Sequence, residues 1–471
     1  MAFDLTHNQS LEELDKAHLF HASSSIADIQ NHGPAIYQSA SGVHVHGLDG
    51  AEYIDAGAGL WCANIGFGRQ EIADVAKQAI EELSFYHLFG GASNPPTIKL
   101  ATRIANLFAR EANAPHLSHV FFGSGGSDAN DTNVKMVRYF NNLRGKPTKK
   151  KFLARSGAYH GLTTASASLT GIPVFHKAWD LPGDDVIHLT CPHFYRFHEE
   201  GEDEADFTDR LINELEEVIA REGADTIAAF IAEPVMGTGG VFVPPAGYFE
   251  RVQEVLKAND ILLIADEVIT GFGRLGGWFG TGEYTLRPDI VTLAKGLSSA
   301  YFPISASVVG DEIWDVLASK SEEMGAFTHG FTYSGHPVGA RIALANIDII
   351  ERERLPQNAA EVGPYLLQGL KHAIGDHEFV GDIRGHGLMV GVEFVADKAS
   401  RRPFDPSAGA HKLVSAACRD AGLLSRALPF IDVMALSPPL ILSKGDADAI
   451  VERFAQGLDR STQTLRELSL G

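Results

Sequence analysis

The stretch Ile261-Leu-Leu-Ile-Ala265-Asp266-Glu267-Val268 decides the fold class, because an unbroken apolar run of strand length ends here on a carboxylate. Such a run is typical of a strand that is buried on both faces of a parallel sheet. Open α/β sheets bind ligands at the carboxyl ends of their strands, so we expect Asp266 to face a site and to need a cationic partner. A turn or helix-capping aspartate is the alternative for this motif taken alone.

Similar short apolar runs alternate with segments of helical period over most of the chain, which predicts an α/β layer architecture with a mostly parallel sheet. Strands are expected at residues 119–122, 151–155, 226–232, 261–265 and 290–293. Helices are expected at residues 128–143 and 248–258 and around residues 207–218.

The two ends of the chain differ from its middle. Asp49-Gly50 lies between two strand-like runs and predicts a small hairpin. Beyond about residue 335 the pattern predicts two helices, a strand pair at 379–384 and 388–394, and a final helix. We therefore expect a large α/β domain at residues 66–330. A smaller α+β domain is expected to be built from both termini, residues 1–65 and 331–471.

Composition narrows the class of partner. The 471 residues include 39 Lys and Arg against 60 Asp and Glu, a formal net charge of −21, which argues against nucleic acid and anionic membrane surfaces as partners. Three cysteines are too few for disulfide bonds to stabilise a chain of this length. The first residues lack the apolar core of a secretory signal, and no run reaches the roughly 18 apolar residues of a membrane span. We therefore expect a cytoplasmic protein.

A second buried run, Asp289-Ile-Val-Thr-Leu293-Ala294, is followed directly by Lys295. Burial lowers the pKa of a lysine and favours the neutral amine, which can condense with a carbonyl group. Lys295 therefore indicates Schiff-base chemistry. A surface lysine whose stem lies along apolar groups is the alternative.

A glycine-rich turn joins a predicted strand to a predicted helix at Phe122-Gly123-Ser124-Gly125-Gly126-Ser127-Asp128. Backbone N–H groups at such a helix start, together with the Ser127 hydroxyl, can hold a phosphate without a cluster of cations. No Gly-Lys-Ser/Thr follows, so this is not a Walker loop. A plain connection is the alternative.

A buried amine, an anion cradle and a carboxylate match the reactive carbon, the phosphate and the ring nitrogen of pyridoxal phosphate (PLP). With these features the sequence resembles the class III aminotransferases, PLP enzymes of fold type I with a three-layer α/β/α domain, and specifically the ω-transaminases (amine:pyruvate aminotransferases). The matching stretches run in the family's order over nearly the whole chain: Gly59–Gly68, Tyr159-His160-Gly161, Glu233-Pro234, Ile264–Arg274, Ala294–Leu297 and Gly330–Pro337.

The resemblance implies a role for each matching residue. Lys295 would form the Schiff base with PLP and move the substrate proton, and Asp266 would pair with the ring nitrogen. Tyr159 would stack on the ring, with Val268 on its other face. The remaining cofactor contacts that the resemblance implies are Gly125, Gly126, Ser127, His160, Glu233, Phe331 and Thr332. Of these, Thr332 would reach across from the second subunit of a homodimer.

The resemblance also implies a substrate site. Trp61, Phe85 and Phe89 would form its aromatic wall, with core packing as the alternative for each. Arg426 would accept the substrate carboxylate; a solvent-exposed arginine is the alternative, because the stretch from Arg426 to Ser437 is longer than the family pattern. The implied reaction is a ping-pong transfer of an amino group from a primary amine or ω-amino acid to pyruvate or another α-keto acid. The assembly would be a dimer or a tetramer.

Other functions stay open at this point. An aminomutase, a racemase or a decarboxylase could use the same fold and cofactor. Gly271-Phe-Gly273-Arg-Leu-Gly276 spells the dinucleotide fingerprint of an NAD-dependent oxidoreductase, but the glycines that follow would break the helix that this fingerprint opens. A non-catalytic binding protein would need none of the three features at the strand ends.

Two further patterns are attributed to chance. The histidine pairs His44/His46 and His116/His119, and the stretch Cys191-Pro-His193, come without a metal-site motif, so no metal is expected. Asn130-Asp131-Thr132 spells a glycosylation acceptor, but no secretory signal accompanies it.

Overall fold

The computed structural model describes residues 10–470. Its strands are β1 (Tyr37–Ser41), β2 (His44–Gly47), β3 (Glu52–Asp55), β4 (Leu117–Gly123), β5 (Lys151–Arg155), β6 (Val186–Leu189), β7 (Ile227–Ala232), β8 (Leu262–Asp266), β9 (Ile290–Leu293), β10 (Ser305–Gly310), β11 (Val380–His386), β12 (Met389–Phe394), β13 (Leu423–Leu424), β14 (Arg426–Ala427) and β15 (Val433–Leu436). Its helices are α1 (Leu11–His18), α2 (Ile26–His32), α3 (Ala58–Trp61), α4 (Gln70–Leu83), α5 (Pro95–Glu111), α6 (Gly126–Leu143), α7 (Thr164–Leu169), α8 (Phe194–Phe197), α9 (Glu204–Glu222), α10 (Tyr248–Ala258), α11 (Gly280–Glu283), α12 (Asp311–Met324), α13 (Pro337–Arg352), α14 (Leu355–Ile374), α15 (Ala410–Asp420) and α16 (Lys444–Ser469).

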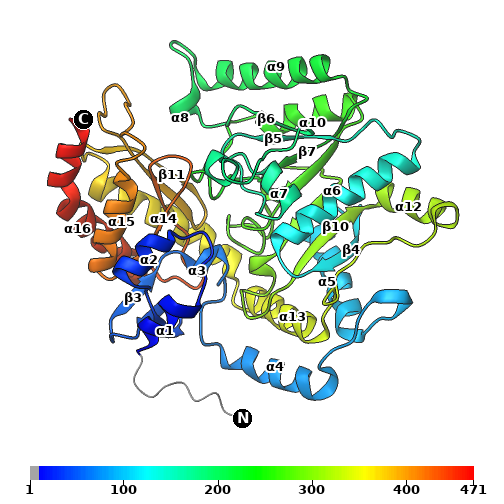
Figure 1. Cartoon of the computed structure of the whole chain (residues 1–471), viewed down its shortest axis with the longest axis horizontal. Coiled ribbons are helices and arrows are strands. Elements are labelled where there is room, and N and C mark those ends of the chain that lie inside the picture. Colours follow the sequence, from blue (N-terminus) through cyan, green and yellow to red (C-terminus); the bar gives the residue numbers. More distant parts are fainter. Residues whose placement is uncertain (1–9, 471) are drawn as a thin grey trace.

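A seven-stranded sheet in the order β4-β10-β9-β8-β7-β5-β6 forms the centre of the molecule (Figure 1). All neighbouring strands are parallel except β10, which runs antiparallel to both β4 and β9. Every residue of β7, β8 and β9 is buried, because these apolar strands have helices on both faces. The predicted α/β class with a mostly parallel sheet is confirmed.

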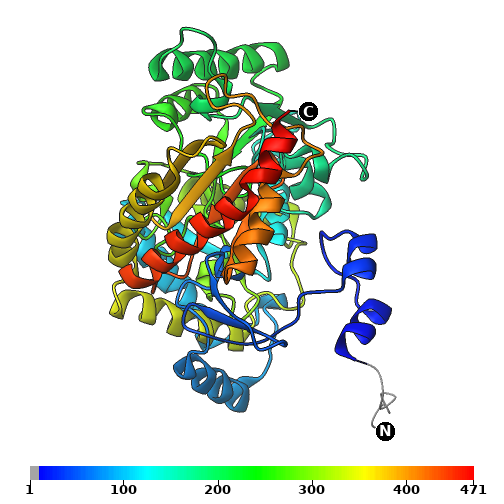
Figure 2. The same ribbon diagram turned by 90° about the vertical axis from the view of Figure 1, so that its left-hand side faces the viewer.

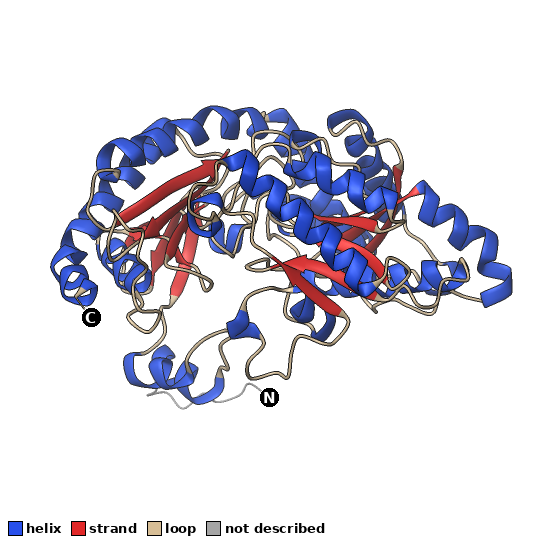
Figure 3. Ribbon diagram, turned by 90° about the horizontal axis from the view of Figure 1, so that it is seen from above, coloured by secondary structure: helices blue, strands red, loops and turns tan. Residues whose placement is uncertain are grey.

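Helices cover the sheet on its two faces, which Figure 3 shows as red strands between blue helices. On one face α6, α7 and α12 bury a cluster that includes Val137, Phe140 and Ile313. On the other face α5, α9 and α10 contribute to the largest core cluster, which includes Phe108, Leu215 and Val252. The sheet is therefore the middle layer of three.

The two ends of the chain meet beside this sheet. β1, β2 and β3 form an antiparallel meander, as the Asp49-Gly50 turn predicts for β2 and β3, and β13 pairs with β3 in parallel. A second small sheet has the order β11-β12-β15-β14. The domain boundaries at residues 66 and 330 stay a prediction. Figure 2 shows α1 and α2 standing away from the rest of the chain, and neither helix has a buried residue.

Most predicted elements match closely: β5, β9 and α10 have the expected bounds. The sequence pattern did not predict β10, because its sequence, SASVVG, is rich in small polar residues that are unusual in a buried strand. Among the helices of residues 10–470, none combines the length and the apolar character of a membrane span.

Candidate active site

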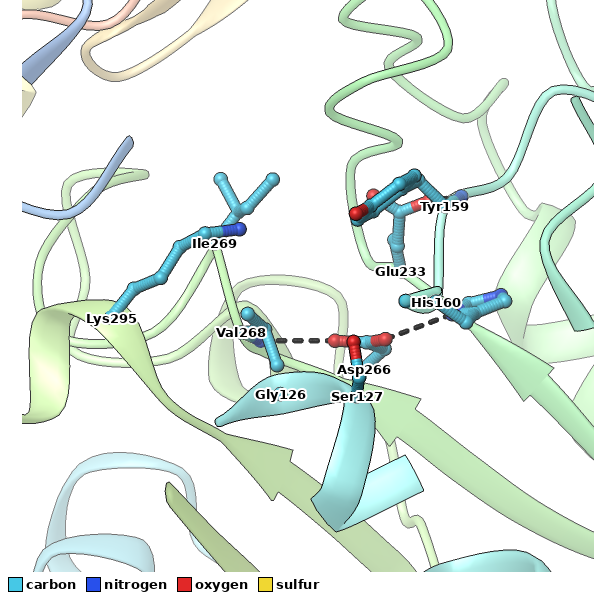
Figure 4. A pocket seen from close by; sticks show the side chains of 10 residues that line it. Gly126, Ser127, Tyr159, His160, Glu233, Asp266, Val268, Ile269 and Lys295 are labelled. Atoms are coloured by element: carbon cyan, nitrogen blue, oxygen red, sulfur yellow. Dashed lines mark hydrogen bonds and ion pairs between the residues drawn. The ribbon is translucent and has the colours of Figure 1, made fainter. Parts of the chain in front are cut away.

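A cavity opens at the carboxyl ends of the parallel strands, where the fold class predicts a ligand site (Figure 4). The residues that line it are Gly126, Ser127, Tyr159, His160, Gly161, Glu233, Asp266, Val268, Ile269 and Lys295. They come from the loops and helix starts that follow β4, β5, β7, β8 and β9. The structure thus brings together in one cavity eight of the residues implied for cofactor binding, namely Gly126, Ser127, Tyr159, His160, Glu233, Asp266, Val268 and Lys295.

Asp266 is the last residue of β8 and is buried. One carboxylate oxygen, Oδ2, accepts hydrogen bonds from His160 Nδ1 at 2.8 Å and from Asn130 Nδ2 at 2.9 Å. The other, Oδ1, accepts one from the Val268 backbone N–H at 3.1 Å. These donors offset the cost of burying the negative charge and fix the orientation of the carboxyl group beside the cavity.

Lys295 follows β9 closely and begins a short 3₁₀ turn, Lys295–Leu297, with a left-handed φ of 44°. Burial of the amine lowers the pKa of Lys295, and the negative charge of Asp266 opposes this effect. The strand end thus delivers a lysine that loses its proton more readily than an exposed lysine does.

Glu233 comes directly after β7 and organises the loop that carries Tyr159. Its Oε1 accepts from the Tyr159 backbone N–H at 3.0 Å, and its Oε2 accepts from the Gly237 N–H at 2.8 Å. Burial raises the pKa values of both the Glu233 carboxyl and the Tyr159 hydroxyl. Glu233 therefore holds the tyrosine through the backbone.

The N-terminus of α6 lies where the anion cradle is predicted. The Asp128 carboxylate accepts from the backbone N–H groups of Ser124 at 2.9 Å and Gly125 at 3.1 Å. Gly125 was implied as a cofactor contact, but this capping interaction already uses its N–H group. The Ser127 hydroxyl accepts from the Leu162 N–H at 3.1 Å, which leaves its own proton free for an anion.

Several predicted residues do not line this cavity. Trp61 is only 1% exposed and packs in a core cluster with Ile269, so the core-packing alternative describes it within one chain. Phe85 and Phe89 are 38% and 51% exposed. Phe331, Thr332 and Arg426 are likewise absent from the lining, and Thr332 is exposed.

The sequence model of the family "Aminotransferase class-III" matches residues 26–458 of this chain. The chain belongs to the class III aminotransferases. It is 44% identical to a diaminobutyrate–2-oxoglutarate transaminase of Halomonas elongata over 98% of both chains. It is 45% identical to a chloroplastic γ-aminobutyrate transaminase of Solanum lycopersicum, covering 92% of this chain and 82% of that protein.

Solved structures agree with this membership. The ω-transaminase of Pseudomonas jessenii in complex with PMP matches with a TM-score of 0.93 and 46% identity over 97% of this chain and 99% of that one. A thermostable (S)-enantioselective ω-transaminase of Thermomicrobium roseum matches with a TM-score of 0.91 and 45% identity over 96% and 98%. The chain is therefore an enzyme of fold type I that uses PLP.

The residues of this aminotransferase fit that cofactor. The cavity presents an anion cradle at Gly126 and Ser127, an amine at Lys295 and a carboxylate at Asp266. A Cβ atom at Gly126 would come within 3.1 Å of both Val268 methyl groups, so the close packing of the cradle favours glycine. Buried His160 Nε2 has no hydrogen-bond partner within residues 10–470, so it is free to serve a bound group.

The sequence reasoning assigned no role to four residues of this aminotransferase site. Gly161 and Ile269 line the cavity, and Asn130 and Thr292 belong to the hydrogen-bond network of Asp266. Asn130 lies one helical turn after Gly126, and this spacing could have indicated it. The glycosylation motif that contains Asn130 is indeed coincidental, since Asn130 is 1% exposed.

The structure gives no support to the NAD-dependent alternative. The glycine-rich stretch at residues 271–276 lies in turns and does not open a helix. His193 is the one histidine of residues 10–470 that lies in a group of possible metal ligands, with Asp382 and Glu393. Arg384 binds both of these carboxylates, at 2.8 and 2.7 Å, so the group forms an ion-pair network.

Proposed function

We propose that this aminotransferase moves an amino group from a primary amine or ω-amino acid to pyruvate or another α-keto acid in two half-reactions at one site. The observation that carries the proposal is the convergence of the Lys295 amine and the Asp266 carboxylate on one cavity beside an anion cradle. The names of the relatives support it, because they describe transaminases of diaminobutyrate and γ-aminobutyrate, amino acids with an amino group remote from the α-carbon.

PLP, when bound, supplies an electron sink that stabilises negative charge on the adjoining substrate carbon. Gly126 and Ser127 would bind its phosphate, and Asp266, a carboxylate held by three donors, would pair with its ring nitrogen. Tyr159 and Val268, which both line the cavity, would pack against its ring. The Lys295 amine, whose pKa burial lowers, takes a proton from the substrate carbon that bears nitrogen. The Lys295 nitrogen would then hold this proton and release it within the same cavity.

Arg426 is proposed to bind the substrate carboxylate. It lies in β14, and burial lowers the pKa of its guanidinium group, with the nearby Tyr159 hydroxyl opposing this effect. Arg426 in turn contributes to the lowered pKa of Lys295, so its charge acts on the cavity. A carboxylate substrate would offset the cost of the partly buried charge.

A homodimer is proposed as the active assembly, with a tetramer as its possible extension. Phe85, Phe89 and Tyr333 are 38%, 51% and 62% exposed in the single chain. Large exposed aromatic groups of this kind are typical of subunit interfaces. The exposed Thr332 adjoins Tyr333, which supports its proposed place at the active site of the partner.

A half-reaction screen tests the proposed function. Purified holoenzyme is mixed with single amines and no acceptor, and the visible absorption of the cofactor is followed; ω-amino acids and primary amines should bleach it. Pyruvate or 2-oxoglutarate should then restore the band and gain the nitrogen. A cofactor that an amine bleaches and no keto acid restores would contradict amino transfer.

A further inference from the structure

A line of buried polar side chains from α6 and β9 leads to Asp266. Asn133 Nδ2 donates to Thr292 Oγ1 at 2.8 Å, and Thr292 Oγ1 donates to Asn130 Oδ1 at 2.7 Å. Asn130 Nδ2 then donates to Asp266 Oδ2 at 2.9 Å and to the backbone carbonyl of His160 at 2.7 Å. Asn130, Asn133 and Thr292 are each at most 1% exposed, so water does not compete for these bonds.

The direction of these bonds follows from the chemistry of the groups. A carboxylate and a backbone carbonyl only accept, so the nitrogen of the Asn130 amide must face Asp266 and His160. The oxygen of Asn130 then faces Thr292, whose single hydroxyl proton it receives. Asn133 Nδ2 donates to the Thr292 oxygen, so it cannot also accept the hydroxyl proton of Thr292. Asn130 Oδ1 is therefore the acceptor for that proton in this line.

Thr292 itself lies outside the cavity. It is paired with Asp266 across β8 and β9, and paired residues of neighbouring strands point to the same face of a sheet. Here that face is the one covered by α6, which carries Asn130 and Asn133. Lys295 follows three positions after Thr292 in the chain.

We propose that Thr292 is a positioning residue: its hydroxyl holds the Asn130 amide in one orientation, and Asn130 thereby fixes the Asp266 carboxylate against the ring nitrogen of the cofactor. This inference rests on the proposed role of Asp266. Without the hydroxyl, the buried Asn130 Oδ1 loses the donor that holds it, and only the two bonds from Asn130 Nδ2 to Asp266 and His160 remain. The Asn130 side chain is then less tightly held, so the Asp266 carboxylate to which it donates is less precisely placed.

The test compares Thr292→Val, which keeps the shape and removes the hydroxyl, with the control Thr292→Ser, which keeps the hydroxyl. Holoenzymes are compared by the rate of the amine half-reaction, by the visible absorption of bound PLP as a function of pH, and by thermal melting. We expect Thr292→Val to slow the half-reaction about 10- to 100-fold, because a buried acceptor, Asn130 Oδ1, is left without its donor. Its pH midpoint should shift, and Thr292→Ser should stay near wild type in both.

Asp266→Asn separates the inference from the proposed function. A wild-type rate for Asp266→Asn would remove the role of Asp266, and with it the inference. If Asp266→Asn slows the half-reaction but Thr292→Val changes only the melting temperature, the positioning role of Thr292 is overturned and the role of Asp266 stands. If Thr292→Val does not fold, Asn130→Ala must reproduce the slower half-reaction and the shifted midpoint, and wild-type behaviour of that variant would also overturn the proposal.

Discussion

Lys295 illustrates how one residue acquires reactivity from its surroundings. Burial at the end of β9 lowers the pKa of its amine, while Asp266 acts in the opposite direction. A lysine with a lowered pKa becomes neutral at a lower pH than an exposed one. The amine is therefore expected to be reactive toward an aldehyde where an ordinary lysine is still protonated.

The pH dependence of cofactor uptake tests this residue. Only the neutral amine condenses with PLP, so the rate of uptake by the apoenzyme should rise with pH. Its midpoint should lie below the usual lysine value of 10.5, because burial lowers the pKa. Stopped-flow absorbance at a series of pH values measures the rate, and a midpoint at or above 10.5 would contradict the effect of burial.

Lys295→Ala should abolish turnover while PLP still binds through the cradle at Gly126 and Ser127. Loss of the general base should slow the reaction by at least about 100-fold. Activity assays and equilibrium dialysis with PLP measure the two properties. Near-normal turnover would refute the assignment of Lys295 as the proton carrier.

At the scale of elements, the start of α6 and the loop after β5 approach closely. Gly161 has a left-handed φ of 125°, and a Cβ atom there would collide with the Ser127 hydroxyl. The two elements can therefore approach this closely only because this position lacks a side chain.

Gly161→Ala should weaken PLP binding by about 10-fold or more, because strain at this φ and displacement of Ser127 act together. Gly445→Ala is the matched control, since Gly445 lies in the first turn of α16 with no atom closer than 3.7 Å to the added Cβ. Fluorescence titration with PLP measures both affinities. Equal affinities for the two variants would show that the loop adapts without loss.

Arg426 lies in the short strand β14, and the pairing of β14 with β15 sets its position. Arg426→Ala should slow the keto-acid half-reaction more than the half-reaction of an amine without a carboxylate. Single-turnover kinetics of each half-reaction give the two ratios. Equal losses in both would count against a carboxylate-binding role.

At the scale of the whole molecule, a buried ion-pair network joins the region around α8 to the sheet β11-β12-β15-β14. Glu393 of β12 interacts with His193, with Arg384 and with Arg196. Burial alone would raise the pKa of Glu393, but the hydrogen bond from His193 and the arginine charges lower it to about 2. The network fixes the C-terminal sheet against the rest of the chain.

Glu393→Gln should destabilise the protein by about 3–5 kcal/mol, because it leaves the Arg196 charge without a counter-ion and Arg384 with Asp382 alone. The contribution of Glu393 is fully present above its usual pKa of 4.5 and is lost as the pH falls toward 2. Denaturant unfolding at several pH values measures the difference from wild type, which should shrink in acid. Glu361→Gln, in an exposed pair with Lys444, should change nothing measurable.

The sequence by itself determined the α/β class, most strand positions and the residues at strand ends, because burial on both faces and the ligand edge of a parallel sheet leave local patterns. Asp266 and Lys295 were found in this way. The cytoplasmic location of the protein stays a prediction.

Only the tertiary structure decided the remaining features. β10 lacks an apolar pattern and owes its place to its two neighbours. Thr292, Asn130 and Asn133 form their line because β9 and α6 pack together across 159 residues of sequence. Capping by Asp128 removed Gly125 from the anion cradle. Hydrogen-bond direction and burial depend on groups that are distant in the chain, and no local pattern encodes them.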